Sequence, residues 1–253
     1  KCVVMLCQLF VGYTSMFNRI ENSMNNQSSQ SAFALIKFFS QKEHYLSFLN
    51  GTSLFRTPHY YRTCEDIGRG DRNESCLLFC DPTFGGKKPK FSLSDGTEIN
   101  YNEFESVLIY PADEQHDAWM QSWAIIDPHN DFGHSLEQMQ NEFGFYFVIL
   151  PANKISHYAK LIEKVSGAKV RYGAVRYSDN PIERSLTVKD SKYSYQKEFR
   201  FFIGECSKVE LKEQFLKLPE LNKLLSDAKS LKFVLPDGSV NYCSVGRKGV
   251  VKA

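Results

Sequence analysis

The stretch YQKEFRFFI, residues 195–203, places charged side chains between large hydrophobic ones, in the alternation typical of a half-buried β-strand. Successive side chains of a strand point to opposite faces of the sheet. Phe199, Phe201 and Ile203 are therefore expected to face the core, and Glu198 to face the other side. Gln196 lies two residues before Glu198, so the strand is expected to present both polar side chains on one face.

Outward from this strand, strands and helices follow one another without a regular alternation. Strands are expected at 33–39, 53–55, 105–110, 119–126, 145–150, 170–177, 231–235 and 242–251, and helices after 40–43 and at 135–143, 153–165 and 211–225, the last interrupted at Pro219. Residues 58–71 are expected to form loops. This order favours a mixed α+β fold over the doubly wound and (β/α)₈ folds.

The segment that follows the first strand carries a helix signal. Ser40 and Glu43 have the spacing of a capping box, in which each side chain bonds a free backbone N–H of the first turn. Gly51 fits the end of this helix. The order strand, capped helix, glycine and second strand is therefore expected between residues 33 and 55.

Length and composition favour one globular domain. The chain has 253 residues, of which 42% are hydrophobic and 14% aromatic, and its net charge of +2 indicates neither a polyanion binder nor an acidic partner. The seven cysteines are irregularly spaced, which favours reduced thiols and a cytoplasmic location. No metal site is expected, because the six histidines lack the spacing of metal ligands.

Residues 1–31 differ from the rest of the chain. The apolar run at 1–17 is too short to span a bilayer, and a polar run at 22–31 reads as a linker. We therefore expect an N-terminal extension and linker at 1–31, a domain at 32–253, and no membrane association. The extension is expected to pack on the domain or on a partner.

Two clusters near the N-terminal third could bind a dinucleotide. Lys37 lies towards the end of the first strand, where it could donate hydrogen bonds to ribose or phosphate. Tyr61 and Arg62, with Arg69 soon after, pair a ring for stacking with cations for pyrophosphate. A surface lysine and an ion-paired loop are the alternative interpretations of the same residues.

These segments together resemble a known group of proteins. FLNGTSLFRTPHYYR at 48–62, RGDRNE at 69–74, FGFYFVIL at 143–150 and YQKEFRF at 195–201 resemble the DUF2971 group of bacterial and phage proteins. Their layout is similar to that of ADP-ribosyltransferase-like toxins of phage defence and toxin–antitoxin systems. The resemblance covers most of residues 32–205 and implies an α+β fold with split antiparallel β-sheets and peripheral helices.

The resemblance also implies a chemistry. NAD would be the substrate, Glu198 would stabilise the oxocarbenium-like transition state, and Gln196 would orient the acceptor. The NAD-binding side chains would be Lys37, Ser40, Tyr61, Arg62, Arg69 and, beside the nicotinamide, Ser122. The acceptor would be a macromolecule, nucleic acid or protein, and an antitoxin or defence protein could be a partner.

Two other functions stay open at this point. A metal-dependent nuclease could use Asp71, Glu74 and Glu198 as carboxylate ligands. A non-catalytic phage or defence protein could bind its partner through an aromatic surface instead.

Overall fold

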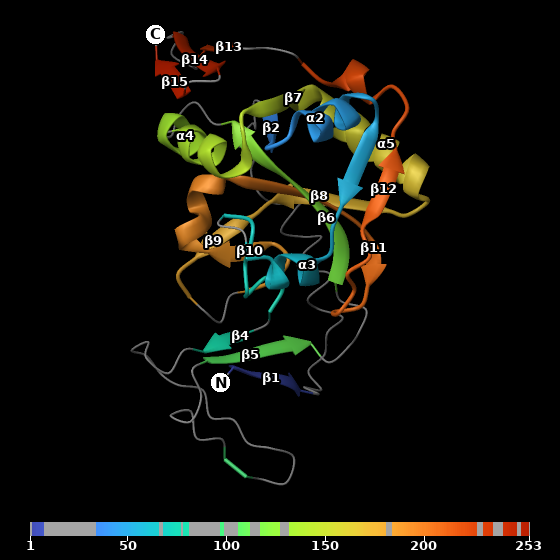
Figure 1. The fold of residues 1–253 in the computed structure, drawn as a ribbon, viewed down its shortest axis with the longest axis vertical. Coiled ribbons are helices and arrows are strands. Elements are labelled where there is room, and N and C mark those ends of the chain that lie inside the picture. Colours follow the sequence, from blue (N-terminus) through green and yellow to red (C-terminus); the bar gives the residue numbers. More distant parts are fainter. Residues whose placement is uncertain are drawn as a thin grey trace.

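A computed structural model describes residues 2–7, 34–65, 68–76, 78–80, 97–98, 106–111, 117–126, 132–180, 184–226, 230–234, 240–246 and 249–252. Its centre is a five-stranded antiparallel sheet in the order β7-β2-β6-β11-β8 (Figure 1). The strands are β2 (Ala34–Phe39), β6 (Asp117–Ile126), β7 (Tyr146–Pro151), β8 (Val170–Ala174) and β11 (Glu198–Cys206). The strand expected within residues 195–203 is confirmed as β11, and it lies between β6 and β8.

Each face of this sheet is covered by a helix. On one face α5 (Ile155–Ser166) packs Tyr158 and Ile162 against Leu35 and Phe201. On the other face α4 (Phe132–Phe143) packs Leu136 and Met139 against strand residues of β2, β6 and β7. Alternating side chains of β2 thus serve two separate cores, which explains why its first three residues are all buried.

The remaining elements surround the central sheet. They are helices α2 (Lys42–Leu49) and α3 (Pro58–Thr63), the 3-10 turns η2 (Ala152–Lys154), η3 (Ser191–Gln196) and η4 (Leu221–Leu224), the antiparallel pair β3 (Thr52–Phe55) with β12 (Gln214–Lys217), and the parallel pair β9 (Arg176–Ser178) with β10 (Val188–Asp190). The fold is therefore α+β, as expected, with mainly antiparallel pairing.

Two small sheets lie at opposite ends of the molecule in Figure 1. One joins β1 (Cys2–Cys7), β5 (Ser106–Pro111) and β4 (Leu78–Cys80), and the other joins β13 (Ser230–Val234), β14 (Val240–Gly246) and β15 (Gly249–Lys252). β1 pairs with β5 in parallel register, so the start of the chain belongs to a sheet shared with the domain. The linker expected at 22–31 lies outside the described residues.

The central sheet splits between β2 and β6. These strands pair only at Ala34 to Ile36, opposite Ile126 to Ala124. Further along β6, the neighbour changes: Arg56, which follows β3, exchanges both main-chain hydrogen bonds with Met120. The end of β2 pairs with β7 alone. The split leaves a gap beside Ser122 that side chains, and not main chain, must fill.

The expectation of a helix at 211–225 is wrong. Residues Gln214–Lys217 form β12, which pairs with β3 in register, and η4 follows Pro219. Leu216 and Leu218 are buried in the core that α5 covers. Apolar residues two apart and Pro219 fit a strand here, because pairing with a strand far away in sequence outweighs the local helical spacing.

The helix after β2 is confirmed, but its capping box is not. The N-cap of α2 is Gln41, which makes no side-chain cap bond, and Ser40 instead accepts a hydrogen bond from Arg69. Residues 58–71 were expected to form loops, but their first part forms helix α3. This helix begins with a Thr57 cap and Pro58. Threonine followed by proline is a helix-start signal that the expected loop overlooked.

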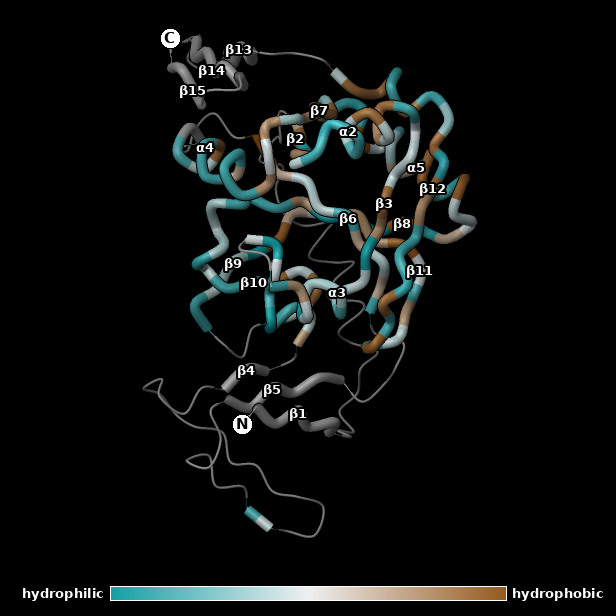
Figure 2. Tube along the Cα trace, viewed as in Figure 1, coloured by the Kyte–Doolittle hydropathy of each residue, from teal (hydrophilic) through white to brown (hydrophobic). Residues whose placement is uncertain are grey.

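The hydropathy of the chain follows this layout. Figure 2 shows mainly hydrophilic chain around α4, β9 and β10, and hydrophobic stretches along β3 and β7. In the part of the chain that is described, no helix combines the length and the hydrophobicity needed to cross a membrane.

Candidate functional site

A cavity of about 410 Å³ opens where the central sheet splits. Its lining comes from both sides of the split and from the segments that cover it. The lining residues include Lys37, Phe39, Ser40, Phe48, Arg56, Tyr61, Arg69, Glu74, Ser122, Trp123, Phe143, Lys189, Gln196, Glu198 and Arg200. The volume lies within the range of small-molecule sites, and the walls mix aromatic rings with charged groups.

The structure brings together all the residues expected to act in catalysis or to bind NAD except Arg62. Glu198, Gln196, Lys37, Ser40, Tyr61, Arg69 and Ser122 all line the cavity. The expected pairing of Gln196 and Glu198 along one strand is wrong, however. Gln196 ends η3, and Lys197 bends the chain in a left-handed conformation (φ 43°) before β11 begins at Glu198. This bend, and not strand alternation, turns both side chains towards the cavity.

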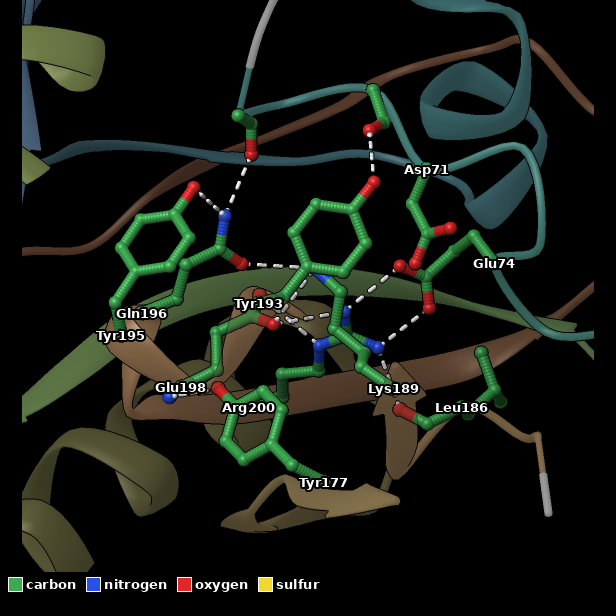
Figure 3. A network of polar contacts seen from close by, with 12 residues as sticks. Asp71, Glu74, Tyr177, Leu186, Lys189, Tyr193, Tyr195, Gln196, Glu198 and Arg200 are labelled. Carbon is green, nitrogen blue, oxygen red and sulfur yellow. Dashed lines mark hydrogen bonds and ion pairs between the residues drawn. The ribbon is translucent and has the colours of Figure 1, made fainter. Parts of the chain in front are cut away.

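Glu198 starts β11 and is almost fully buried. Its Oε2 atom lies 3.1 Å from Nη2 of Arg200 and 3.2 Å from Nζ of Lys189, and its Oε1 atom accepts from Nε of Arg200 at 3.3 Å (Figure 3). The side chain of Ser122, across the strand pair, is also a hydrogen-bond partner. The strand register brings Ser122 opposite Arg200, which explains this contact.

These partners keep the carboxylate ionised. Burial by itself raises the pKa of Glu198, but the charges of Arg200 and Lys189, with hydrogen bonds from Ser122 and Arg200, lower it to about 2. The cavity wall therefore carries a fixed carboxylate at neutral pH.

Arg200 is itself buried between two carboxylates. Its guanidinium binds Glu74 through bonds of 2.6 and 2.9 Å and donates to the carbonyl of Leu186 at 2.7 Å. Burial lowers the pKa of Arg200, but Glu198 and Glu74 outweigh it and raise the pKa well above its usual value. Nearby, burial and the charge of Glu74 raise the pKa of Asp71.

Lys189 reaches the same cluster from β10. Its Nζ atom lies 3.0 Å from Oε1 of Gln196 and 4.6 Å from the centre of the Tyr193 ring, in addition to its contact with Glu198. Gln196 in turn donates to the carbonyl of Gly68 at 2.8 Å and to the hydroxyl of Tyr195 at 3.2 Å. Figure 3 shows these side chains meeting from η3, β10, β11 and the 68–76 segment.

Lys37 fills the split in the sheet. Its Nζ atom donates to the main-chain carbonyl of Ser122 at 2.9 Å, and it lies 5.9 Å from the Trp123 ring and 6.0 Å from the Phe39 ring. Burial and the nearby charges of Arg56 and Arg69 lower the pKa of Lys37 to about 8, although Glu198 acts in the opposite direction. The ammonium group thus replaces a main-chain donor that the missing strand pairing would supply.

Arg56 and Arg69 add positive charge near Lys37. The Arg56 guanidinium stacks 4.0 Å from the Tyr60 ring and binds Glu213 at 2.7 Å, while Arg69 donates to Ser40 at 3.2 Å. Tyr61 also lines this cavity, and burial raises its pKa. The cavity therefore has three cationic side chains from β2, the end of β3 and the 68–76 segment.

The expectation that Arg62 lies with the other NAD-binding side chains is wrong, because Arg62 is outside the cavity lining. Its guanidinium bonds the carbonyl of Glu74 at 2.9 Å, Asp117 at 3.2 Å and the carbonyl of Lys208. These bonds connect α3 to the segment before β4, to the start of β6 and to the segment after β11. The side chain is 8% exposed, so its role is to hold the fold.

The carboxylates proposed for a nuclease do not form an open metal site. Glu74 and Glu198 both bind the guanidinium of Arg200, which occupies the position a cation would need. Within the described ranges, no group of three or more His, Cys, Asp or Glu side chains could hold a metal ion. Cys64, Cys76 and Cys206, the cysteines with described side chains, are free thiols.

Three charged residues that shape the site were not among the expected catalytic or NAD-binding residues. Arg200 carried a signal, since a charged residue inside FRFFI on the same face as Glu198 has to be paired when buried. Lys189 and Arg56 carried no such sequence signal, because their partners lie on other elements.

A fixed carboxylate with its ion pairs, an aromatic wall and three cationic side chains thus line one cavity. The chain matches no known protein-family model, and comparisons with curated proteins and with solved structures find no significant similarity.

Proposed function

We propose that this protein is an ADP-ribosyltransferase-like enzyme that uses NAD as its substrate and modifies a macromolecule, nucleic acid or protein. The observation that supports this most directly is the position of Glu198. Its carboxylate is buried, ionised and fixed on the wall of a cavity that opens at a split in an antiparallel sheet. Lys37, Tyr61 and Ser122, from three other elements, line the same cavity.

The proposed reaction needs a carboxylate in this setting. When the bond between nicotinamide and the ribose carbon breaks, its electron pair leaves with nicotinamide and positive charge develops on the ribose. A preorganised carboxylate stabilises that charge without reorganisation of solvent. The acceptor then bonds the ribose carbon and releases its proton. Glu198 supplies the negative charge, and Ser122 and Arg200 fix its orientation.

The rest of the cavity suits the other parts of NAD. The rings of Phe39, Phe48 and Trp123 offer apolar faces for a nicotinamide or adenine ring. Lys37, Arg56 and Arg69 provide positive charge that suits a pyrophosphate. A cavity of about 410 Å³ can enclose a large part of such a ligand.

The biological setting follows from this chemistry. An enzyme that consumes NAD and modifies nucleic acid or protein would act as a toxin in the cytoplasm, where both are present. An antitoxin or another defence protein would then restrain it. The irregular spacing of the seven cysteines favours the same location.

The test is incubation of the purified protein with NAD labelled on the adenylate and a lysate containing protein and nucleic acid. Wild type should release nicotinamide and label one class of acceptor, and Glu198→Gln should do neither. Glu205→Gln is the matched control, because Glu205 lies on the same strand but is exposed. Equal labelling by wild type and E198Q would contradict the proposed role of Glu198. No labelling by wild type, together with binding of a partner protein, would favour the non-catalytic alternative.

A further inference from the structure

Gln196 has no hydrogen left to offer an acceptor. Its amide nitrogen donates to the carbonyl of Gly68 and to the hydroxyl of Tyr195, and its oxygen accepts from Lys189 at 3.0 Å. The residue is only 4% exposed. An amide group has two N–H donors, so both are in use. To orient an acceptor by donating a bond, Gln196 would first have to break one of these buried bonds, which is costly.

Lys189 is enclosed by three groups. The carboxylate of Glu198 lies at 3.2 Å, the oxygen of Gln196 at 3.0 Å and the centre of the Tyr193 ring at 4.6 Å. Lys189 is 5% exposed, so its charge is largely withdrawn from water. A buried ammonium keeps a fixed position only when such partners surround it.

We propose that Lys189 is a positioning residue of Glu198 alongside Arg200, and that Gln196 serves the site by clamping Lys189 and not by touching the acceptor. This inference rests on the proposed function for its catalytic meaning. The charge pair itself is a property of the folded protein and can be measured without turnover.

The geometry distinguishes Lys189 from Arg200. Arg200 is committed to Glu74 through two short bonds, and its bonds to Glu198 are longer, at 3.1 and 3.3 Å. Lys189 approaches the same Oε2 atom from a different element, β10. The two cations therefore hold Oε2 from two directions. Together they fix the plane of the carboxylate, which one contact alone would not do.

Other charged and titratable groups also act on Glu198 and must be kept constant in a test. The groups that face it or interact with it electrostatically are Lys37 on β2, Tyr61 on α3, Glu74 through Arg200, Tyr177 on β9 and Arg200 on its own strand. None of them is changed by a substitution at position 189 or 196.

The direct test measures the pKa of Glu198 by NMR of protein carrying ¹³C-labelled glutamate, with E198Q to assign the signal. An opposite charge within a few ångströms lowers a carboxyl pKa by roughly one to three units, so Lys189→Met should raise it by about one unit or more. Lys189→Arg should restore most of the shift. Gln196→Glu, which supplies a competing carboxylate, should also raise it.

Lys192→Met is the matched control. Lys192 lies on η3 and contacts the same Tyr193 ring at 4.9 Å, but it is exposed. The substitution Lys192→Met should therefore leave the pKa of Glu198 unchanged. If thermal unfolding shows that K189M folds poorly, the pKa of Glu198 is measured in Q196E and K189R instead.

The second arm measures turnover against pH. K189M should lower kcat about tenfold or more with little change in KM, and should move the acid limb of activity to higher pH. A purely structural role would not move that limb. If wild type lacks turnover but K189M and Q196E shift the pKa, the proposed function fails and the Lys189–Glu198 coupling stands. Unchanged pKa values in both variants would overturn the inference whatever the activity.

Discussion

Arg200 and Glu74 form a buried ion pair with two parallel hydrogen bonds of 2.6 and 2.9 Å, although 126 positions separate them in the chain. Both side chains are at most 2% exposed. The pair fastens the segment before β4 to the start of β11, and it fixes the guanidinium that holds Glu198. One residue thereby couples the stability of the fold to the geometry of the site.

Arg200→Met should strongly destabilise the protein. It leaves two carboxylates buried without their partner, and breaking a buried pair in this way costs about 3–5 kcal/mol. Urea denaturation followed by circular dichroism measures the free energy of unfolding. Lys223→Met, which removes an ion pair exposed to solvent, should have no measurable effect. Similar losses in the two variants would show that burial does not decide the contribution.

Acid should weaken the protein partly through Glu198. Its pKa is lowered from 4.5 to about 2 in the folded state, so its stabilising contribution is complete above pH 4.5 and disappears as pH falls towards 2. The difference in free energy of unfolding between wild type and Glu198→Gln should narrow across that window. Urea titrations at pH 5, 4 and 3 test this, with Glu205→Gln expected to follow wild type. A constant difference would contradict the low pKa.

Lys37 should also make the stability of the protein rise with pH, in the alkaline range. Its pKa is lowered from 10.5 to about 8, so between these values the unfolded chain binds more protons than the folded protein. Stability attributable to Lys37 therefore rises with pH from 8 to 10.5. Comparison of wild type with Lys37→Met by urea denaturation isolates this rise. The exposed Lys42, changed to Met, serves as control and should retain it.

Two glycines that end helices should differ in their tolerance of alanine. Gly144 has φ 107°, and a Cβ there would lie 2.3 Å from the carbonyl oxygen of Phe39 and 2.4 Å from Cα of Ser40. Gly167 has φ 69° with open space around it. Gly167→Ala should cost about 1–2 kcal/mol from backbone strain alone. Gly144→Ala should cost more, on the order of 3 kcal/mol.

The same pair of variants tests how the cavity wall is held. Phe39 and Ser40 line the cavity, so a shift forced by G144A should also weaken binding of NAD or ADP-ribose. G167A should bind as wild type does. Thermal unfolding and calorimetric titration provide the two readouts, and equal behaviour of the variants would refute the steric argument.

Local sequence signals predicted most of the central sheet. Alternating and continuous hydrophobic runs predicted β2, β6, β7 and β11 within a few residues, and helical spacing predicted α4 and α5. The segment 211–225 failed because its apolar spacing fits a helix locally, whereas β3 offers it a partner strand. Only the pairing of residues far apart in the chain decides between the two.

The candidate site shows the same division between what local sequence signals predict and what contacts between distant residues decide. The sequence by itself determined that Glu198 leaves the core face of its strand, because the period of two in a β-strand is a local property. It also placed Lys37 towards the end of β2. The tertiary structure alone decided that the sheet splits beside Ser122, that Lys37 fills the split, and that Lys189 and Gln196 meet Glu198. The physical reason is that buried charges are fixed by partners on other elements, and the energy of such a pair depends on distances that no local pattern encodes.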